Sequence, residues 1–378
     1  MKPTRLLSLD AFRGFTIAAM LLVNNPGDWG HLYAPLEHAK WNGWTFTDWV
    51  FPFFVFIAGM AMSLSLARRA AAGADKGRLL AQTARRAATI ILIGLLLNWI
   101  PHFDLAHVRI PGVLQRLGLC TLLAAPIVLW CGSRGIALWA LGLLAFYSAV
   151  QLGVAVPNAE GVLQRGVLEP GQDVGAWLDR WLMDGHLWVQ SKTWDPEGLL
   201  STLPAVASQL LGVLAGQVLS SSSRPAEKAM TWVLSGLACL WLGQVLDAWL
   251  MPINKSLWTP SYVFAMAGWA QLVFAVFFWL LDAMPQPLAR ERWAQRLHPL
   301  IVFGMNALFL FALSGLIAKM LGFIHLADGR SLNAALYAPI QSLGLAPENA
   351  SLLRAVLFVL AMYAVAWGMY RQGWFIKA

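Results

Sequence analysis

The sequence predicts an all-α, polytopic transmembrane helix bundle of about ten helices with both termini in the cytoplasm. Of the 378 residues, 58% are hydrophobic and only 12% are charged, about half the charge of a typical soluble domain. Apolar stretches of roughly 20 residues, the length that spans a hydrocarbon core, recur along the whole chain. The 20 tryptophans outnumber the 6 tyrosines, as expected where indole rings lie at the membrane–water boundary.

Ten apolar segments predict the membrane spans of one domain, residues 1–378. These segments are 6–24, 46–67, 82–100, 112–130, 134–152, 199–219, 229–250, 260–281, 298–320 and 351–370. Asp10 and Arg13 interrupt the first, and no small-residue cleavage site follows it, so we expect an uncleaved span. With the N-terminus in the cytoplasm, inner segments contain sixteen Lys and Arg residues and outer segments eight. This ratio supports the orientation.

The segments between the spans differ in chemistry on the two sides. Inner connections are short, as at 131–134, or basic, as at 68–86. The longest outer loop, 153–198, has seven acidic residues against three basic ones and also four tryptophans. Six of the seven histidines also fall in outer segments. The net charge of +8 therefore reflects topology, and we expect no nucleic-acid partner.

Ionisable residues inside a membrane are costly and need a partner or a function. Asp10 and Arg13 lie three residues apart on one helical face and are able to pair. Arg13 either forms a structural ion pair or lines a cytoplasmic cavity and binds a phosphate. Asn24 ends the same span, about 16 Å from Arg13 at helical rise.

His38 lies in the outer loop that follows the first span, ten residues before Asp48 at the mouth of the second. A loop histidine is often only a hydrogen-bonded bystander. Asp48 either orients the imidazole or caps the helix. The residues alone leave both interpretations open.

Four further polar strings lie near the spans. Helix caps or interhelical hydrogen bonds explain each string taken separately, but they explain the whole set poorly. They are RIPGVLQRLG (109–118), DPEG (195–198), NKSLWTPSY (254–262) and Asn306. The three cysteines, Cys120, Cys131 and Cys239, fall in or beside apolar segments. We therefore expect them to be small packing residues, and we expect neither a disulfide framework nor a zinc site.

In order along the chain, these strings resemble the lysosomal heparan-α-glucosaminide N-acetyltransferases and their bacterial relatives. The resemblance rests on Asp10-x-x-Arg13-Gly14, Val23-Asn24, the string from His38-x-x-Trp41-Asn42-Gly43 through Asp48 to Ile57, the four strings named above, GMN (304–306) around Asn306, and the terminal WFIK (374–377). It implies an acetyltransferase in a bacterial inner membrane that takes acetyl-CoA from the cytosol and acetylates an amino sugar on the other side.

The resemblance also implies a histidine in the first outer loop and an asparagine ending the first span. We expect His38 as general base, Asn24 as oxyanion donor and Asp48 as the group that orients the imidazole. The residues expected to bind acetyl-CoA are Arg13, Gln115, Arg116, Arg371 and Lys377. Those expected to bind the amino sugar are Asn42, Asp195, Glu197, Asn254 and Trp258. The extended arm of coenzyme A roughly matches the distance from Arg13 to Asn24.

Several alternatives remain open at this stage. An acetyl-histidine intermediate rivals direct transfer, which we prefer. A membrane transporter of amino sugars or oligosaccharides would also have ten spans and a polar midplane. A metal-dependent hydrolase would use His102, Asp104 and His107, whose spacing is loose, and we expect no metal. The expected partners are the sugar and the lipid bilayer, and a homodimer is one possible assembly.

Overall fold

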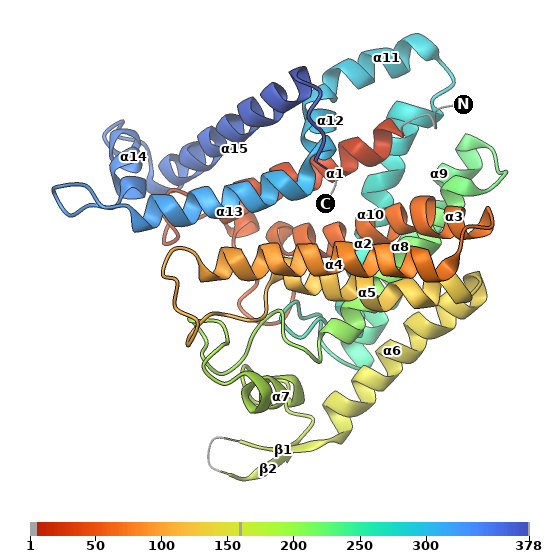
Figure 1. Cartoon of the computed structure of the whole chain (residues 1–378), viewed down its shortest axis with the longest axis horizontal. Helices are drawn as coiled ribbons and strands as arrows, with labels where there is room; N and C mark the ends of the chain where they lie inside the picture. Colours follow the sequence, from red (N-terminus) through yellow and green to blue (C-terminus); the bar gives the residue numbers. More distant parts are fainter. Residues whose placement is uncertain (1–5, 159–160, 377–378) are drawn as a thin grey trace.

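Long apolar helices form almost the whole fold (Figure 1). The computed structural model describes residues 6–158 and 161–376. In that part, 9 helices are long and apolar enough to cross a membrane, and a bent pair brings the number to 10. The predicted all-α bundle of about ten spans is confirmed. The nine are α1 (Leu7–Asn24), the α2 span (Phe46–Ala71), α4 (Lys76–Trp99), α5 (Val113–Trp130), α6 (Ser133–Gly153), α8 (Thr202–Ser220), α9 (Pro225–Trp249), the α10 span (Pro260–Ala283) and α15 (Pro347–Arg371).

Two of these spans change helix type along their length. The α2 span comprises the 3-10 helix η2 (Phe46–Trp49), α2 (Val50–Met62), the π-helical η3 (Ser63–Ala67) and α3 (Arg68–Ala71). The α10 span comprises α10 (Pro260–Phe278) and the π-helical η4 (Trp279–Ala283). In η4, a carboxylate oxygen of Asp282 accepts a hydrogen bond from the Ser8 backbone N–H at 3.0 Å. This contact satisfies one of the free N–H groups at the start of α1.

Several short elements were not predicted, because none gives an apolar window of membrane length. They are the 3-10 helix η1 (Ala34–Leu36), α7 (Val174–Met183), α11 (Pro287–Arg296), α14 (Leu332–Gln341) and the antiparallel strands β1 (Ala155–Pro157) and β2 (Leu163–Arg165). Their starts follow ordinary capping chemistry. Asp173 accepts the Ala176 N–H before α7, and Ser331 accepts the Ala334 N–H before α14.

The predicted continuous span 298–320 is instead broken at Asn306. Helices α12 (His298–Met305) and α13 (Ala307–Phe323) meet there at a bend of 81°. The side chain of Asn306 donates to the Trp374 carbonyl and accepts from the Ile376 N–H, both at 2.9 Å. The C-terminal tail therefore turns back toward the middle of the bundle after α15 (Figure 1) and occupies the polar groups at the bend.

Glycines permit the closest helix contacts. A Cβ on Gly14 of α1 would overlap the Leu300 carbonyl oxygen of α12, and a Cβ on Gly304 would overlap the carbonyl oxygen of Asp10. The sequence strings around residues 10–14 and 304–306 thus pack directly on each other. In α8, Gly212 and Gly216 lie in the same way against the backbone of α2. Small residues four positions apart let two helices approach closely in this way.

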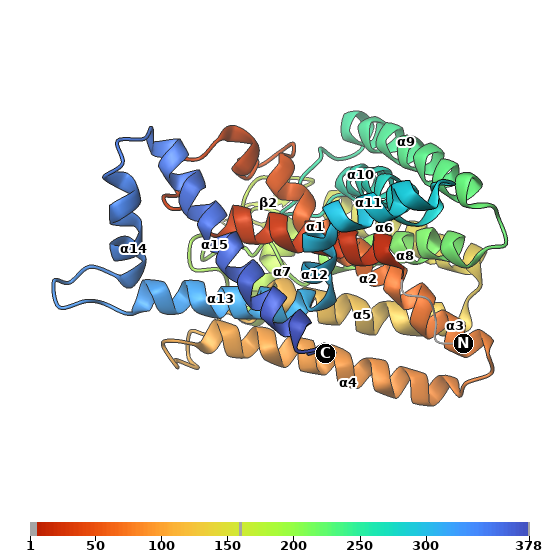
Figure 2. The ribbon, with the colours of Figure 1, turned by 90° about the horizontal axis from the view of Figure 1, so that it is seen from above.

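Burial separates central from peripheral helices. The most apolar windows of α1, the α2 span and α8 are each 67% buried, whereas those of α4 and α9 are only 22% and 17% buried. Figure 2 shows α4 and α9 at opposite edges of the bundle. Since both edges are apolar, α4 and α9 are the helices that would contact lipid most fully.

Candidate active site

His38 and Asp48 meet at the end of the bundle where α1 ends and the α2 span begins. The Nδ1 atom of His38 lies 2.7 Å from Oδ1 of Asp48. The Asp48 side chain is 1% exposed and the His38 side chain is 49% exposed. Because a carboxylate only accepts, Nδ1 donates to Asp48, and a neutral imidazole in this orientation has its lone pair on Nε2. All the contacts of His38 among the described residues use Nδ1, so Nε2 is the ring nitrogen available to a ligand.

Asp48 is fixed by local backbone geometry. Its Oδ2 accepts the backbone N–H groups of Ala39 and Thr45, each at 3.0 Å. The Thr45 contact belongs to a capping box at the start of η2. Tyr262 of α10 also donates its hydroxyl to the Asp48 carbonyl at 2.6 Å. The carboxylate is therefore both a helix cap and the partner of His38, so the two interpretations of Asp48 hold together.

Lys255 is a third member of this group that the sequence interpretation did not select. Its Nζ lies 3.2 Å from Oδ1 of Asp48 and 3.1 Å from Nδ1 of His38. The residue lies in the loop between α9 and α10, within the string 254–262. Its place in that string was the only signal in the sequence, because more than 200 residues separate it from His38.

Asn42 and Asn254, both expected to bind the sugar, contact each other. The Asn254 amide donates to Oδ1 of Asn42 at 3.1 Å, and the Gly43 N–H donates to the Ile253 carbonyl at 2.7 Å. Asn254 is fully buried, whereas Asn42 is exposed. The pair joins the His38 loop to the Lys255 loop, and only Asn42 has a surface that a ligand can reach.

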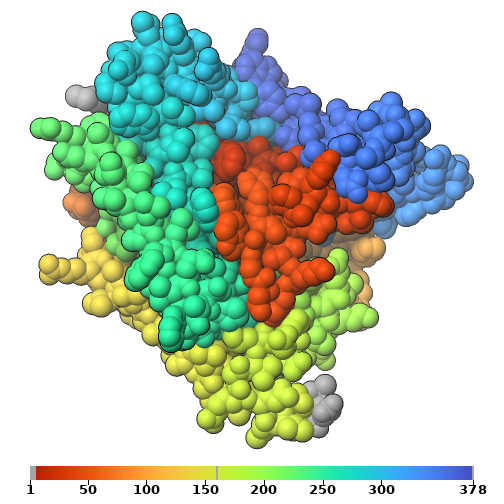
Figure 3. All heavy atoms as spheres, turned by 180° about the vertical axis from the view of Figure 1, so that it is seen from behind, coloured from red at the N-terminus to blue at the C-terminus, as the bar shows by residue number. Residues whose placement is uncertain are grey.

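Asn24 is exposed at the last residue of α1. The preceding Val23 packs with Leu36, Phe46 and Val50. The end of α1 and the His38 loop therefore lie at the same end of the bundle. In Figure 3 the N-terminal segment, coloured red, reaches the surface between α9–α10 and the blue C-terminal segment.

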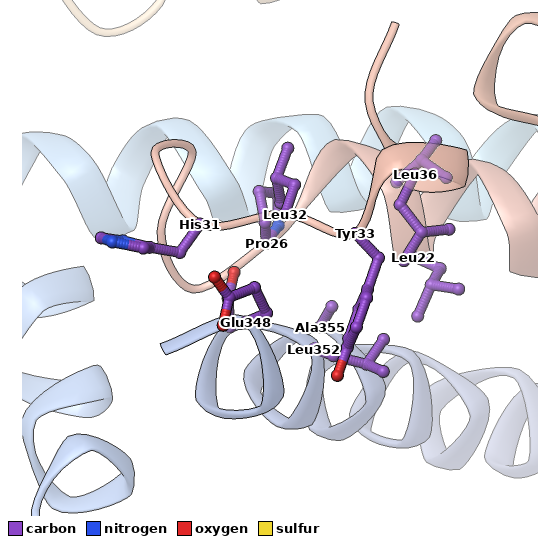
Figure 4. Close-up of a pocket in the computed structure, with 11 residues that line it drawn as sticks. Leu22, Pro26, His31, Leu32, Tyr33, Leu36, Glu348, Leu352 and Ala355 are labelled. Carbon is purple, nitrogen blue, oxygen red and sulfur yellow. The ribbon is translucent and has the colours of Figure 1, made fainter. Parts of the chain in front are cut away.

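A small pocket lies where the segment after Asn24 meets the start of α15. Figure 4 shows Leu22, Pro26, His31 and Tyr33 on one side and Glu348, Leu352 and Ala355 on the other. Ser351 of α15 accepts the Gly27 N–H on its carbonyl at 3.2 Å and the Asp28 N–H on its hydroxyl at 3.0 Å. Helix α15 thereby fixes the chain between Asn24 and His38.

Asp195 and Glu197, expected to attract a cationic sugar, instead pair with Arg109. Arg109 binds Asp195 through two hydrogen bonds of 2.8 and 2.6 Å and Glu197 through one of 2.5 Å. Burial lowers the pKa of Arg109, but the hydrogen bonds and charges of the two carboxylates outweigh it and raise that pKa above its usual value. One guanidinium thus offsets much of the negative charge of this loop.

Arg116 of α5 and Trp258, which directly precedes α10, pack together inside the bundle. The Arg116 guanidinium lies 5.2 Å from the Trp258 ring centroid and donates to the Gly198 carbonyl at 2.8 Å and to the Ser201 hydroxyl. Both side chains are 1% exposed. Nε and Nη1 of Arg116 and Nε2 of the neighbouring Gln115 are buried without a hydrogen-bond partner in the described structure. Arg116 therefore faces the DPEG loop (195–198).

Asp179 of α7 is a buried acid that the sequence interpretation did not select. Its side chain accepts the Leu199 N–H at 2.9 Å, and the residue is 2% exposed. Burial raises the pKa of Asp179 to about 7, the Leu199 hydrogen bond opposes this and the charge of Asp195 adds to it. Asp179 lines a small polar cavity together with Asp173, Trp194 and Ser256. This cavity adjoins the Lys255 loop.

The other residues expected to bind acetyl-CoA are Arg13, Arg371 and Lys377. Arg13 pairs with Asp10 at 3.2 Å, as expected, and its side chain is 26% exposed. Arg371 is exposed in the last turn of α15. Lys377 lies outside the described residues. Gly304 and Asn306 bring the C-terminal tail and α12 to the stretch of α1 that contains Asp10 and Gly14.

The three residues of the metal alternative do not form one site. His107 contacts Asp104 at 2.7 Å, while the His102 ring packs edge-on against Phe323. In residues 6–158 and 161–376, no group of three His, Cys, Asp or Glu side chains is placed to bind a metal ion. The hydrolase alternative therefore has no ligand set there.

Comparisons with known proteins place this arrangement in a family. Residues 5–251, which include His38 and Asp48, match the family model described as heparan-alpha-glucosaminide N-acetyltransferase, catalytic. The chain is 31% identical over 359 residues to the human heparan-alpha-glucosaminide N-acetyltransferase, covering 82% of this chain and 52% of that protein. The mouse enzyme of the same name is 30% identical over 361 residues, covering 81% of this chain and 53% of its own length. The chain spans about half the length of these curated relatives, and it belongs to the heparan-α-glucosaminide N-acetyltransferase family.

Proposed function

We propose that this chain is a transmembrane N-acetyltransferase. It transfers an acetyl group from cytosolic acetyl-CoA to the amine of a glucosamine-type sugar on the periplasmic side of a bacterial inner membrane. The observation that supports this best is the His38–Asp48 pair, whose buried carboxylate and half-exposed imidazole lie at the outer end of the bundle. Family membership supports the same chemistry.

His38 would act as the general base. Acetyl-CoA supplies an activated acetyl thioester. As the sugar nitrogen forms its bond to the acetyl carbon and the carbon–sulfur bond breaks, Nε2 of His38 accepts the proton of the amine. Asp48 keeps the proton of the imidazole on Nδ1, which leaves the Nε2 lone pair directed outward. This step would contribute about 10²–10⁴-fold in rate.

Asn24 would donate its side-chain amide to the acetyl carbonyl oxygen. Its support is its exposed position at the end of α1, beside the loop that contains His38. A donor directed at an oxygen that gains negative charge is worth about 3 kcal/mol. Asn24 and His38 then act on the same acetyl group, one on its oxygen and the other on the attacking amine.

The donor would bind from the inner side. Arg13 is partly exposed in the inner half of α1, and Arg371 is exposed at the inner end of α15. Guanidinium groups suit phosphates. Only the neutral acetyl group then needs to reach the outer end, which avoids moving a charged nucleotide through hydrocarbon. Gln115 and Arg116, whose side chains have donors without a hydrogen-bond partner in the described structure, would bind the polar arm that leads outward.

The acceptor site would form around the outer loops. Asn42 is exposed beside the His38 loop, and Trp194 packs edge-on against Trp41 at 5.2 Å. Because Arg109 neutralises much of the charge of Asp195 and Glu197, these two acids would shape the site, with Asn254 and Trp258, more than attract the amine directly.

A vesicle assay tests the proposal. Purified protein is reconstituted with glucosamine trapped inside vesicles, and labelled acetyl-CoA is added outside, for wild type and His38→Ala. Labelled N-acetyl sugar inside the vesicles with wild type alone supports it. Label transfer that is unchanged in His38→Ala removes the catalytic assignment. Sugar efflux without acetyl-CoA supports the transporter alternative, and isolation of acetylated His38 without acceptor supports the acetyl-histidine route.

A further inference from the structure

Lys255 shares a buried carboxylate oxygen with His38. Oδ1 of Asp48 lies 2.7 Å from Nδ1 of His38 and 3.2 Å from Nζ of Lys255. The Lys255 side chain is only 20% exposed, although lysine usually lies in solvent. An ammonium 3.1 Å from an imidazole nitrogen is close enough to control the charge on the ring.

The loop that contains Lys255 is rigidly anchored. Asn254 accepts the Leu257 N–H on its side chain at 2.9 Å and donates its own N–H to the Thr259 hydroxyl at 3.0 Å. Trp258 has a positive φ of 53° and donates its indole N–H to Ser208 at 3.0 Å. A non-glycine residue with this φ is uncommon and persists only where surrounding contacts fix it. The short loop therefore aims Lys255 at the His38–Asp48 pair.

We infer that Lys255 is a positioning residue whose ammonium offsets the charge of Asp48 and so keeps the His38 imidazole unprotonated between turnovers. The inference rests on the proposed function, in which neutral His38 is the base. Lys255 lies beyond residues 5–251, the range that matches the family model.

The charges around His38 explain why a neutral imidazole needs Lys255. A buried carboxylate beside an imidazole favours the imidazolium form, which has no lone pair on Nε2. Lys255 adds an opposing positive charge, so that Asp48 and Lys255 together are neutral. The other charged side chains close to the ring in sequence are Glu37 and Lys40 of its own loop, and both residues are exposed and so are screened by solvent.

The same ammonium also helps His38 to release its proton. When Nε2 takes the proton of the amine, the imidazolium faces Lys255 across 3.1 Å. That repulsion favours passing the proton to the sulfur that leaves as the carbon–sulfur bond breaks. The imidazole ring is then neutral for the next turnover, and the proton of the amine ends on the thiol of coenzyme A.

Lys255→Met tests this role because it keeps the length of the side chain and removes the charge, whereas Lys255→Arg keeps the charge. We expect the acid limb of the pH profile of kcat/KM to move upward by about one pH unit in Lys255→Met and to stay near wild type in Lys255→Arg. The matched control is Lys40→Met, an exposed lysine of the His38 loop, whose profile should superimpose on that of wild type. An unmoved acid limb in a folded, active Lys255→Met would overturn the inference.

A second measurement is independent of transferase activity. Proteins labelled with ¹⁵N at histidine are titrated by NMR without acetyl-CoA, and His38→Gln assigns the signal. We expect the His38 titration midpoint to rise by about one pH unit in Lys255→Met. A midpoint that does not move contradicts the inference even if the enzyme is active. If the His38 midpoint moves but the wild-type protein transfers no acetyl group, the role of Lys255 is supported and the proposed function is contradicted.

Discussion

Nδ1 of His38 lies 2.7 Å from Oδ1 of Asp48, and this contact joins the loop after α1 to the start of the next span. The carboxylate also accepts two backbone N–H groups through Oδ2. The turn itself thus sets the orientation of the Asp48 carboxylate, and that orientation fixes which nitrogen of His38 points away from Asp48. The reactivity of the imidazole therefore depends on a helix cap.

Asp48→Asn should lower kcat by about 100-fold or more, with little change in KM for acetyl-CoA. The amide is able to rotate and donate to Nδ1, which would favour the tautomer without a lone pair on Nε2. Steady-state transfer of labelled acetyl groups measures this effect. The thermal stability of the purified variant serves as the control for folding. A variant with full kcat would show that Asp48 only caps η2.

Asn24→Ala should lower kcat by about 100-fold while leaving both KM values nearly unchanged, because the lost hydrogen bond strengthens as charge develops on the carbonyl oxygen. Asn25→Ala is the matched control, since the Asn25 amide donates to the Leu21 carbonyl and closes the helix end. Equal losses in the two variants would indicate a general effect on the end of α1.

Arg13→Gln should raise KM for acetyl-CoA about tenfold, because the variant loses a charge-assisted contact with a phosphate. The KM for the sugar should not change. Arg134→Gln, at an exposed arginine in the first turn of α6, provides the control for a general change in inner-face charge. If Arg13→Gln alters only stability, the Asp10–Arg13 pair is structural.

The sequence predicted the spans well because each is a long apolar window whose length is set by the bilayer. The break at Asn306 was missed because its cause is distant. The polar groups of that side chain bind Trp374 and Ile376, about 70 residues later in the chain. An asparagine in an apolar run does not reveal such a partner.

The candidate site was predicted only in part, again because some of its contacts join residues that are far apart in the chain. His38 and Asp48 are only ten residues apart, and their contact was one of the two interpretations that the sequence left open for Asp48. Lys255 reaches them from more than 200 residues away. Asp195 and Glu197 were expected to face a ligand, but Arg109, over 80 residues earlier, binds both. The charge of a residue can be read from the sequence, whereas the distant residue that it pairs with depends on how the helices pack.

Asp179 predicts a pH-dependent stability that is separate from catalysis. Burial raises its pKa to about 7 from an ordinary value of 3.8. Between these values the folded protein binds a proton that the unfolded chain lacks. The stabilisation is therefore full below about pH 4 and is lost as the pH rises to about 7, with an upper limit of about 4 kcal/mol.

Asp179→Asn removes this dependence because the amide stays neutral at every pH. We expect the apparent Tm of the variant, relative to wild type, to rise by several degrees between pH 5 and pH 8. Asp184→Asn, an exposed acid just after α7, should follow wild type throughout. Thermal unfolding in detergent at each pH measures the difference. Parallel Tm curves for wild type and Asp179→Asn would contradict a raised pKa of Asp179 and would mean that this carboxyl is already ionised in the folded protein at pH 5.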